Sequence, residues 1–185
     1  MRILGVSGSL RDGSHNTLLL REAAELFELE VEFELFDGLK DVPPYDEDDD
    51  VGDGPAGAAR FRAALAEADG VLIATPEYNS SIPGQLKNAL DWASRPLATN
   101  PLRNVPVAVV GASNGAFGAV WAQAETRKVL AAMGARVVGD EVPVGRASAR
   151  LADDGRLLDG ELEERVRDLL SELVAAVEER AALAA

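Results

Sequence analysis

The chain has 185 residues, a formal net charge of −14, no cysteine and a single histidine, His15. This length predicts one domain over residues 1–185. Without cysteine there can be no disulfide, thiolate nucleophile or thiolate metal site. With one histidine there can be no multi-histidine metal centre, so we expect no metal. The acidic charge argues against nucleic acid as a partner, because non-specific nucleic-acid binding needs basic surface.

Hydropathy predicts a protein outside the membrane. No apolar run approaches the roughly 20 residues that a membrane-spanning helix needs. Residues 1–8 contain too short an apolar stretch for a signal peptide and lead directly into a glycine-rich turn. We therefore expect a cytoplasmic protein with no membrane partner.

Apolar, β-branched runs alternate with helical patterns along the chain. The runs at 71–74 and 107–110 are apolar at every position, which is typical of central strands in a parallel sheet covered on both faces. The pattern predicts an α/β fold, a flavodoxin-like three-layer sandwich whose five parallel strands have the order 2-1-3-4-5, with helices on both faces. The expected strands are 2–6, 31–36, 70–75, 105–111 and 136–139, and the expected helices are about 15–29, 56–68, 83–94, 117–133 and 160–182.

The loop after the first expected strand, residues 7–17, has the composition of a phosphate site. Gly8 and Gly13 allow tight turns, and hydroxyls, an amide and Arg11 converge on the start of a helix. The two glycines have the spacing of a nucleotide P-loop, but Ser14-His15 replaces the required Lys-Ser/Thr pair, and no GxGxxG is present. A single terminal phosphate fits better than a triphosphate or a dinucleotide. A polar turn with Ser14 as helix cap is the simpler alternative.

The loops after the third and fourth expected strands, the second and third loops of the expected site, also carry polar groups. Residues 75–84 contain two prolines and the flat ring of Tyr78, and could present backbone N–H groups to a planar heterocycle or form an ordinary turn. Residues 111–118 contain Gly-x-Ser-x-Gly, as in a hydrolase nucleophile elbow. A hydrolase is not favoured, because no histidine follows Ser113. The acidic run 46–50 is interpreted as a solvated loop.

Taken together, two motifs resemble the NADPH-dependent FMN reductase family. The first is Gly8-Ser9-Leu10-Arg11 with Ser14-x-Asn16. The second, longer motif is Pro76-Glu77-Tyr78-Asn79 with Pro83-Gly84-x-Leu86-Lys87-Asn88-Ala89-x-Asp91-Trp92. The resemblance extends over nearly the whole chain, whereas the third loop matches only as a Gly/Ser-rich pattern.

The resemblance implies a function and a set of site residues. It implies an FMN cofactor and NADPH or NADH as co-substrate, with hydride passing through flavin N5 to a small-molecule acceptor such as a quinone, free flavin, chromate or an azo compound. The first loop would hold the FMN phosphate, the second would lie against the isoalloxazine, and the third would touch its far end. No catalytic residue is implied, because the flavin carries the chemistry. The implied cofactor-binding residues are Ser9, Arg11, Ser14, Asn16, Thr17, Pro76, Glu77, Tyr78, Asn79, Ser80, Ser113, Asn114 and Gly115.

The resemblance also bears on the oligomeric state, on the role in electron transfer and on the recognition of NADPH. Members of the family that the chain resembles are usually dimers or pairs of dimers. The resemblance therefore implies a homodimer or homotetramer, with the helix carrying Lys87, Asp91 and Trp92 at the subunit boundary. An electron carrier without its own nicotinamide site is the alternative, since acidic charge suits docking to basic partners. A flavin-dependent sensor is a weaker one. For the 2′-phosphate of NADPH, Arg103 is a candidate by its position near the fourth strand.

Overall fold

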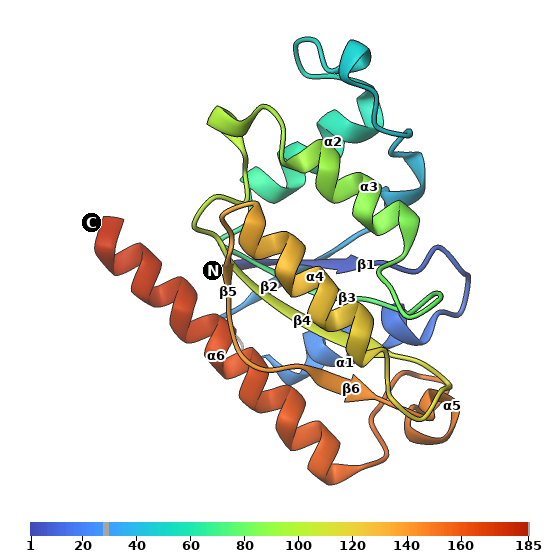
Figure 1. The fold of residues 1–185 in the computed structure, drawn as a ribbon. Coiled ribbons are helices and arrows are strands. Elements are labelled where there is room, and N and C mark those ends of the chain that lie inside the picture. The colour runs from blue at the N-terminus through green and yellow to red at the C-terminus, as the bar shows by residue number, and fades with distance from the viewer. Residues whose placement is uncertain (28–29, 185) are drawn as a thin grey trace.

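A parallel sheet forms the middle layer of the computed structural model, which describes residues 1–27 and 30–184 (Figure 1). Within these residues the strand order is β2-β1-β3-β4-β5, with β6 also paired to β4. β3 and β4 are buried along their whole length, as expected for apolar central strands. The predicted 2-1-3-4-5 order is confirmed. The strands are β1 (Arg2–Ser7), β2 (Glu32–Phe36), β3 (Gly70–Ala74), β4 (Pro106–Ala112), β5 (Arg136–Val137) and β6 (Val142–Val144).

The edge beyond β4 differs from the prediction of one strand at 136–139. β5 pairs with the first residues of β4, and β6 pairs with its last three. The chain turns away from the sheet between them at Gly139, whose φ is +63°. β6 was not predicted, because it is short and follows the polar segment 139–141. This split matters because β6 brings a further loop to the carboxyl edge of the sheet.

Helices cover both faces of the sheet (Figure 1). One core cluster joins the sheet to α2, α3 and α4, and a second joins it to α1 and α6. The predicted helices are present, but α4 starts three residues later than expected, and the expected end of the first helix lies outside the described residues. The helices are α1 (His15–Leu26), α2 (Ala56–Ala66), α3 (Gly84–Ala93), α4 (Val120–Ala132), α5 (Ala147–Arg150) and α6 (Gly160–Ala184).

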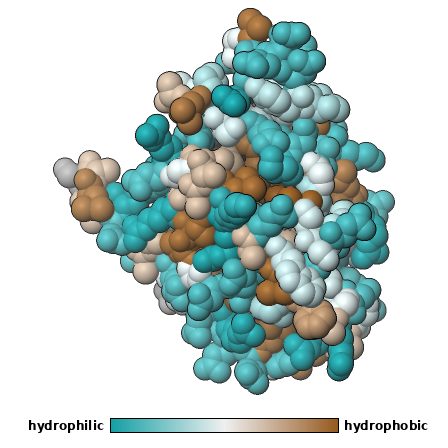
Figure 2. Space-filling view, in the orientation of Figure 1, coloured by the Kyte–Doolittle hydropathy of each residue, from teal (hydrophilic) through white to brown (hydrophobic). Residues whose placement is uncertain are grey.

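The surface is mostly hydrophilic on the face that Figure 2 shows, with hydrophobic residues in scattered patches. Among residues 1–27 and 30–184, no helix combines the length and the apolar character needed to cross a membrane.

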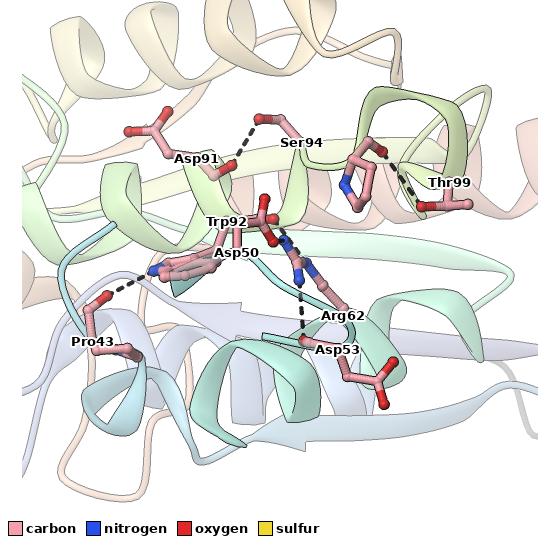
Figure 3. A network of polar contacts seen from close by, with 9 residues as sticks. Pro43, Asp50, Asp53, Arg62, Asp91, Trp92, Ser94 and Thr99 are labelled. Carbon is pink, nitrogen blue, oxygen red and sulfur yellow. Dashed lines mark hydrogen bonds and ion pairs between the residues drawn. The ribbon is translucent and has the colours of Figure 1, made fainter. Parts of the chain in front are cut away.

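The acidic segment 46–50 is exposed over residues 46–49, as expected for a solvated loop, but its last residue, Asp50, is not. Asp46 caps a short 3-10 turn, and Asp50 forms an ion pair with Arg62 of α2 at 2.8 Å, in which both side chains are largely buried. Arg62 also donates to the carbonyls of Trp92 and Asp53 and lies over the Trp92 ring, as Figure 3 shows in part. Like charges repel along the segment, but one well-placed cation draws Asp50 against the protein. We call these contacts the Arg62 network.

Candidate functional site

The carboxyl ends of β1, β3 and β4 meet at a pocket of about 270 Å³. The loops that follow these strands form its walls, as the strand order predicts. Thr17, Asn79, Ser80 and Gly115 do not line it. The predicted site residues that do line it are Ser9, Arg11, Ser14, Asn16, Pro76, Glu77, Tyr78, Ser113 and Asn114.

Several polar residues of the first loop hold the loops together. The Ser14 hydroxyl accepts from the backbone N–H groups of Asn16 and Thr17 and caps α1. The buried Asn16 amide donates to the carbonyl of Ala112 at 3.0 Å and accepts from its N–H at 2.9 Å. The Thr17 hydroxyl donates to that of Ser7 at 2.9 Å. These side chains fix the first loop against the end of β4, and their contact with a cofactor stays a prediction.

Arg11 is the exposed cation of the first loop. Its guanidinium donates to the carbonyl of Gly13 at 2.8 Å. Gly13 has a φ of +64°, which turns the loop tightly before α1. Across residues 1–27 and 30–184 no carboxylate, that of the neighbouring Asp12 included, lies within ion-pair distance of Arg11. Arg11 is placed to receive an anion.

His15 is the first residue of α1 and is partly enclosed. Its Nε2 lies 3.3 Å from the Ser148 hydroxyl, and its buried Nδ1 has no hydrogen-bond partner in the described part of the chain. Burial lowers the pKa of His15, and the charge of Arg11 lowers it further. The ring is therefore neutral at neutral pH, beside the pocket.

The second loop carries a tight turn that presents an aromatic ring. Tyr78 and Ser81 exchange backbone hydrogen bonds at 3.1 Å in both directions. Asn79 and Ser80 between them have φ values of 54° and 59°, the left-handed conformation of a type I′ turn. The Tyr78 side chain is 53% exposed at the mouth of the pocket. A planar ligand could stack on this ring without displacing protein contacts.

Two glutamates tie the second loop to α4. Glu77 of the loop accepts from the N–H groups of Trp121 and Ala122 at 3.0 and 3.2 Å, which supplies the side-chain cap that α4 otherwise lacks. Glu125 of α4 accepts from the Ser81 hydroxyl at 2.6 Å and from the Ile82 N–H at 3.1 Å. These hydrogen bonds, the Ser81 hydroxyl first, lower the pKa of Glu125. The reciprocal arrangement holds the loop in one position relative to α4.

The third loop shows no hydrolase geometry. The Ser113 hydroxyl accepts from the N–H of Gly115 at 3.1 Å, in a local turn. The His15 ring lies against Ser148 instead, and Ser148 donates to Asn114 at 2.6 Å. Since His15 Nδ1 has no orienting partner among the described residues, this pair also lacks the third member of a catalytic triad.

Arg103 lies at the wrong end of the sheet to meet a ligand in this pocket. It precedes β4 in a turn whose Asn104 N–H donates to Gly134, just after α4 ends. β4 has seven residues, which places its two ends roughly 20 Å apart. The expectation that Arg103 could bind the 2′-phosphate of NADPH is therefore wrong for a nicotinamide bound at the carboxyl edge.

Comparison with known proteins identifies the family. The model of the NADPH-dependent FMN reductase family matches residues 1–149. The chain belongs to this family. It is 40% identical over 174 residues to an NAD(P)H-dependent FMN reductase of Pseudomonas aeruginosa, which covers 94% of this chain and 93% of the relative. A 2-hydroxy-1,4-benzoquinone reductase of a Burkholderia species is 35% identical over 181 residues, covering 97% of this chain and 98% of the relative.

A solved structure supports the same assignment. A flavoenzyme NAD(P)H:(acceptor) oxidoreductase from Paracoccus denitrificans superposes with a TM-score of 0.83 at 32% identity, covering 96% of this chain and 97% of that chain. This chain, as a member of the NADPH-dependent FMN reductase family, is an oxidoreductase with the expected flavodoxin-like fold, FMN as cofactor and NAD(P)H as electron donor.

Sequence reasoning missed two residues that shape the site. Glu125 lies in the middle of a helix, and no local pattern shows that it faces a loop more than 40 residues earlier. Ser148 follows β6, which was not predicted, so its contacts with Asn114 and His15 could not be foreseen. A short apolar run followed by Gly145 was the available indication of a further loop at this edge.

Proposed function

We propose that this chain binds FMN in the pocket at the carboxyl edge and reduces quinone-type acceptors with NAD(P)H. The observation that carries the proposal is the convergence of three loops from β1, β3 and β4 on one pocket. Arg11, which has no carboxylate partner among residues 1–27 and 30–184, lies at one end, and the exposed ring of Tyr78 lies at the mouth. The names of the Burkholderia and Pseudomonas relatives support the acceptor and cofactor classes.

The first loop fits a single phosphate. Arg11 supplies a cation that forms charge-assisted hydrogen bonds with phosphate oxygens. Next to Gly13 a side chain would meet nothing within 4 Å, so an oxygen can approach the backbone there. The loop lacks the lysine that would hold a triphosphate. Ser9 and Arg11 are proposed as the principal phosphate contacts, with Ser14, Asn16 and Thr17 fixing the loop around them.

The second and third loops would hold the ring system. Bound FMN supplies hydride transfer from the nicotinamide and delivery of electrons to the acceptor. Tyr78 offers a stacking surface, Pro76 and Glu77 form the adjacent wall, and Glu125 fixes the loop from α4. Ser113 and Asn114 close the opposite side. Asn79 and Ser80 act through their left-handed backbone, since neither residue lines the pocket, and Gly115 acts through its N–H, which donates to the Ser113 hydroxyl.

A homodimer or homotetramer in the cytoplasm completes the proposal. Tyr78, Phe117 and Trp121 are exposed aromatic residues near the pocket, and a partner subunit would cover them. α3 can contribute Lys87 and Asp91, which form an exposed ion pair. Trp92 cannot, because its side chain is fully buried and its indole N–H donates to the carbonyl of Pro43.

Anaerobic mixing of the FMN-loaded protein with NADPH or NADH tests the proposal. We expect the flavin absorbance to bleach with either donor alone and to return when benzoquinone is added. The acidic electron carrier is the competing function, and the net charge of −14 favours it. Bleaching that requires a separate reductase protein would establish the carrier and refute the proposed enzyme.

A further inference from the structure

A second pocket, of about 450 Å³, lies beside the proposed FMN pocket. Its walls come from the start of α4 and from the loop that follows β6. Its charged lining residues are two arginines, Arg146 and Arg150, and no carboxylate lines it. Phe117 contributes an aromatic wall that is 63% exposed. A pocket lined only by cationic and apolar residues is unexpected in a chain with a net charge of −14, and we call it the arginine pocket.

Hydrogen bonds join the two pockets through a shared wall. The Arg146 backbone N–H donates to the carbonyl of Gly115 at 3.0 Å, and the Ala147 backbone N–H donates to the carbonyl of Ser113 at 3.0 Å. Gly145 allows this close approach, because a Cβ there would lie 2.4 Å from the carbonyl oxygen of Ala116. The segment 113–117 therefore borders the proposed FMN pocket on one side and the arginine pocket on the other.

Arg146 is the available cation of this pocket. No carboxylate within residues 1–27 and 30–184 lies within ion-pair distance of its guanidinium, whereas seven other arginines have such a partner: Arg2, Arg60, Arg62, Arg127, Arg136, Arg150 and Arg167. Arg150 keeps only a long contact of 3.7 Å to Asp159. The Arg146 backbone is in the left-handed conformation, with φ of 52°, and is held there by Gly115.

Another cationic pocket borders the first loop, but its position and charge suit the cofactor phosphate. Arg11, Arg21 and Lys40 line it together with Asp12 and Asp37. It shares Ser9, Arg11 and Ser14 with the proposed FMN pocket, at the phosphate end. The arginine pocket instead adjoins the third loop, at the end where the flavin ring would lie. A dinucleotide whose nicotinamide stacks on that ring must carry its phosphates past this loop.

We propose that the arginine pocket binds the phosphate groups of the nicotinamide dinucleotide, with Arg146 as the principal contact. This inference rests on the proposed function and assigns the donor its binding site. Arg146 would donate to phosphate oxygens, Arg150 would add a second positive charge, and Phe117 offers a stacking surface to the adenine ring. The diphosphate is common to NADH and NADPH, and the 2′-phosphate is specific to NADPH.

Titration of the FMN-loaded protein with NADP⁺ and with NAD⁺ tests the site. Isothermal calorimetry at one salt concentration measures the dissociation constant of each ligand. Arg146→Gly removes the guanidinium while suiting the left-handed backbone, so the fold is retained. We expect the dissociation constant to rise roughly ten- to a hundredfold, as for loss of one charge-assisted hydrogen bond. A rise for both ligands assigns the diphosphate, and a rise for NADP⁺ alone assigns the 2′-phosphate. Arg146→Lys should recover part of the affinity.

Arg103→Ala is the matched control, because it removes the same charge at the opposite edge of the sheet. It should leave both dissociation constants within about twofold of the parent. Unchanged NADP⁺ and NAD⁺ binding in Arg146→Gly, with the parent binding normally, would overturn the arginine pocket and leave the proposed function standing. Failure of the parent to bind either dinucleotide or to oxidise NADPH would overturn both.

Discussion

The Arg62 network and the carboxyl-edge loops use arginine in opposite ways. Arg62 is almost enclosed, and an aspartate, two carbonyls and a tryptophan ring satisfy its guanidinium. Arg11 and Arg146 are exposed, and no carboxylate in the described chain pairs with either. Within residues 1–27 and 30–184, seven of the fifteen arginines have a carboxylate partner. Those held at the ligand edge without one are the residues to test for binding, whereas Arg62 is a residue to test for stability.

The largest expected effect is on stability, from Arg62→Ala. It would leave Asp50 largely buried without its cation, and breaking a buried pair in this way costs about 3–5 kcal/mol. Chemical denaturation measures the change in the free energy of unfolding. Arg60→Ala on the same helix is the control, because its pair with Asp37 is exposed and should cost less than about 1 kcal/mol. Equal losses in the two variants would contradict the structural role of Arg62.

Arg11→Ala should act on binding rather than on stability. Loss of a charge-assisted hydrogen bond of about 1.5–3 kcal/mol should weaken FMN binding roughly ten- to a hundredfold. Riboflavin, which has no phosphate, should bind the variant and the parent alike. Fluorescence titration at one salt concentration measures both ligands. If FMN binds both proteins equally, Arg11 is a solvated turn residue and not a phosphate contact.

Glu125→Ala should have a moderate effect on both properties. It removes two hydrogen bonds to the second loop, so we expect a loss of about 1 kcal/mol in stability and weaker binding of both FMN and riboflavin. Glu125→Gln keeps an oxygen acceptor and should lose less. Weakening of FMN binding alone would contradict a role in positioning the loop, because the ring system is common to the two ligands.

His15 should give the smallest effect, a slope in stability with pH. Its pKa is lowered in the folded state, so the unfolded chain takes up a proton first as the pH falls through about 6.5. The folded state therefore loses stability toward lower pH, and the full contribution is present above that range. His15 is the only histidine, so denaturation of His15→Gln between about pH 5.5 and 7.5 should show a flatter profile. An unchanged profile would show that burial of His15 has no energetic consequence.

The sequence predicted that β3 and β4 are central strands, because they are apolar at every position. The full order followed from five strands alternating with helices, which suits a flavodoxin-like sheet. The sequence also predicted which loops meet, since the carboxyl ends of parallel strands share one edge. It did not predict β6, because three apolar residues after a polar turn are too few to define a strand. The Asp50–Arg62 pair was missed for a different reason. The two residues are distant in sequence, and composition shows only that like charges repel.

The sequence predicted which three loops form the site. It did not predict which of their polar residues hold the loops together and which remain available to a ligand. Asn16 and Ser14 look like phosphate ligands in the sequence, whereas the structure shows them making buried contacts within the protein. Glu77 looks like a flavin contact and also caps α4. Hydrogen bonds between distant segments decide which polar residues remain available to a ligand, and such bonds depend on tertiary structure.

The proposed function requires that the carboxyl-edge pocket binds a flavin through its single phosphate. Competitive titration of the flavin-free parent protein with FMN and riboflavin tests it most directly. Because the phosphate contributes several charge-assisted hydrogen bonds of about 1.5–3 kcal/mol each, FMN should bind on the order of a hundredfold more tightly than riboflavin, or better. Equal affinity for FMN and riboflavin would contradict the assignment of the first loop as the phosphate site.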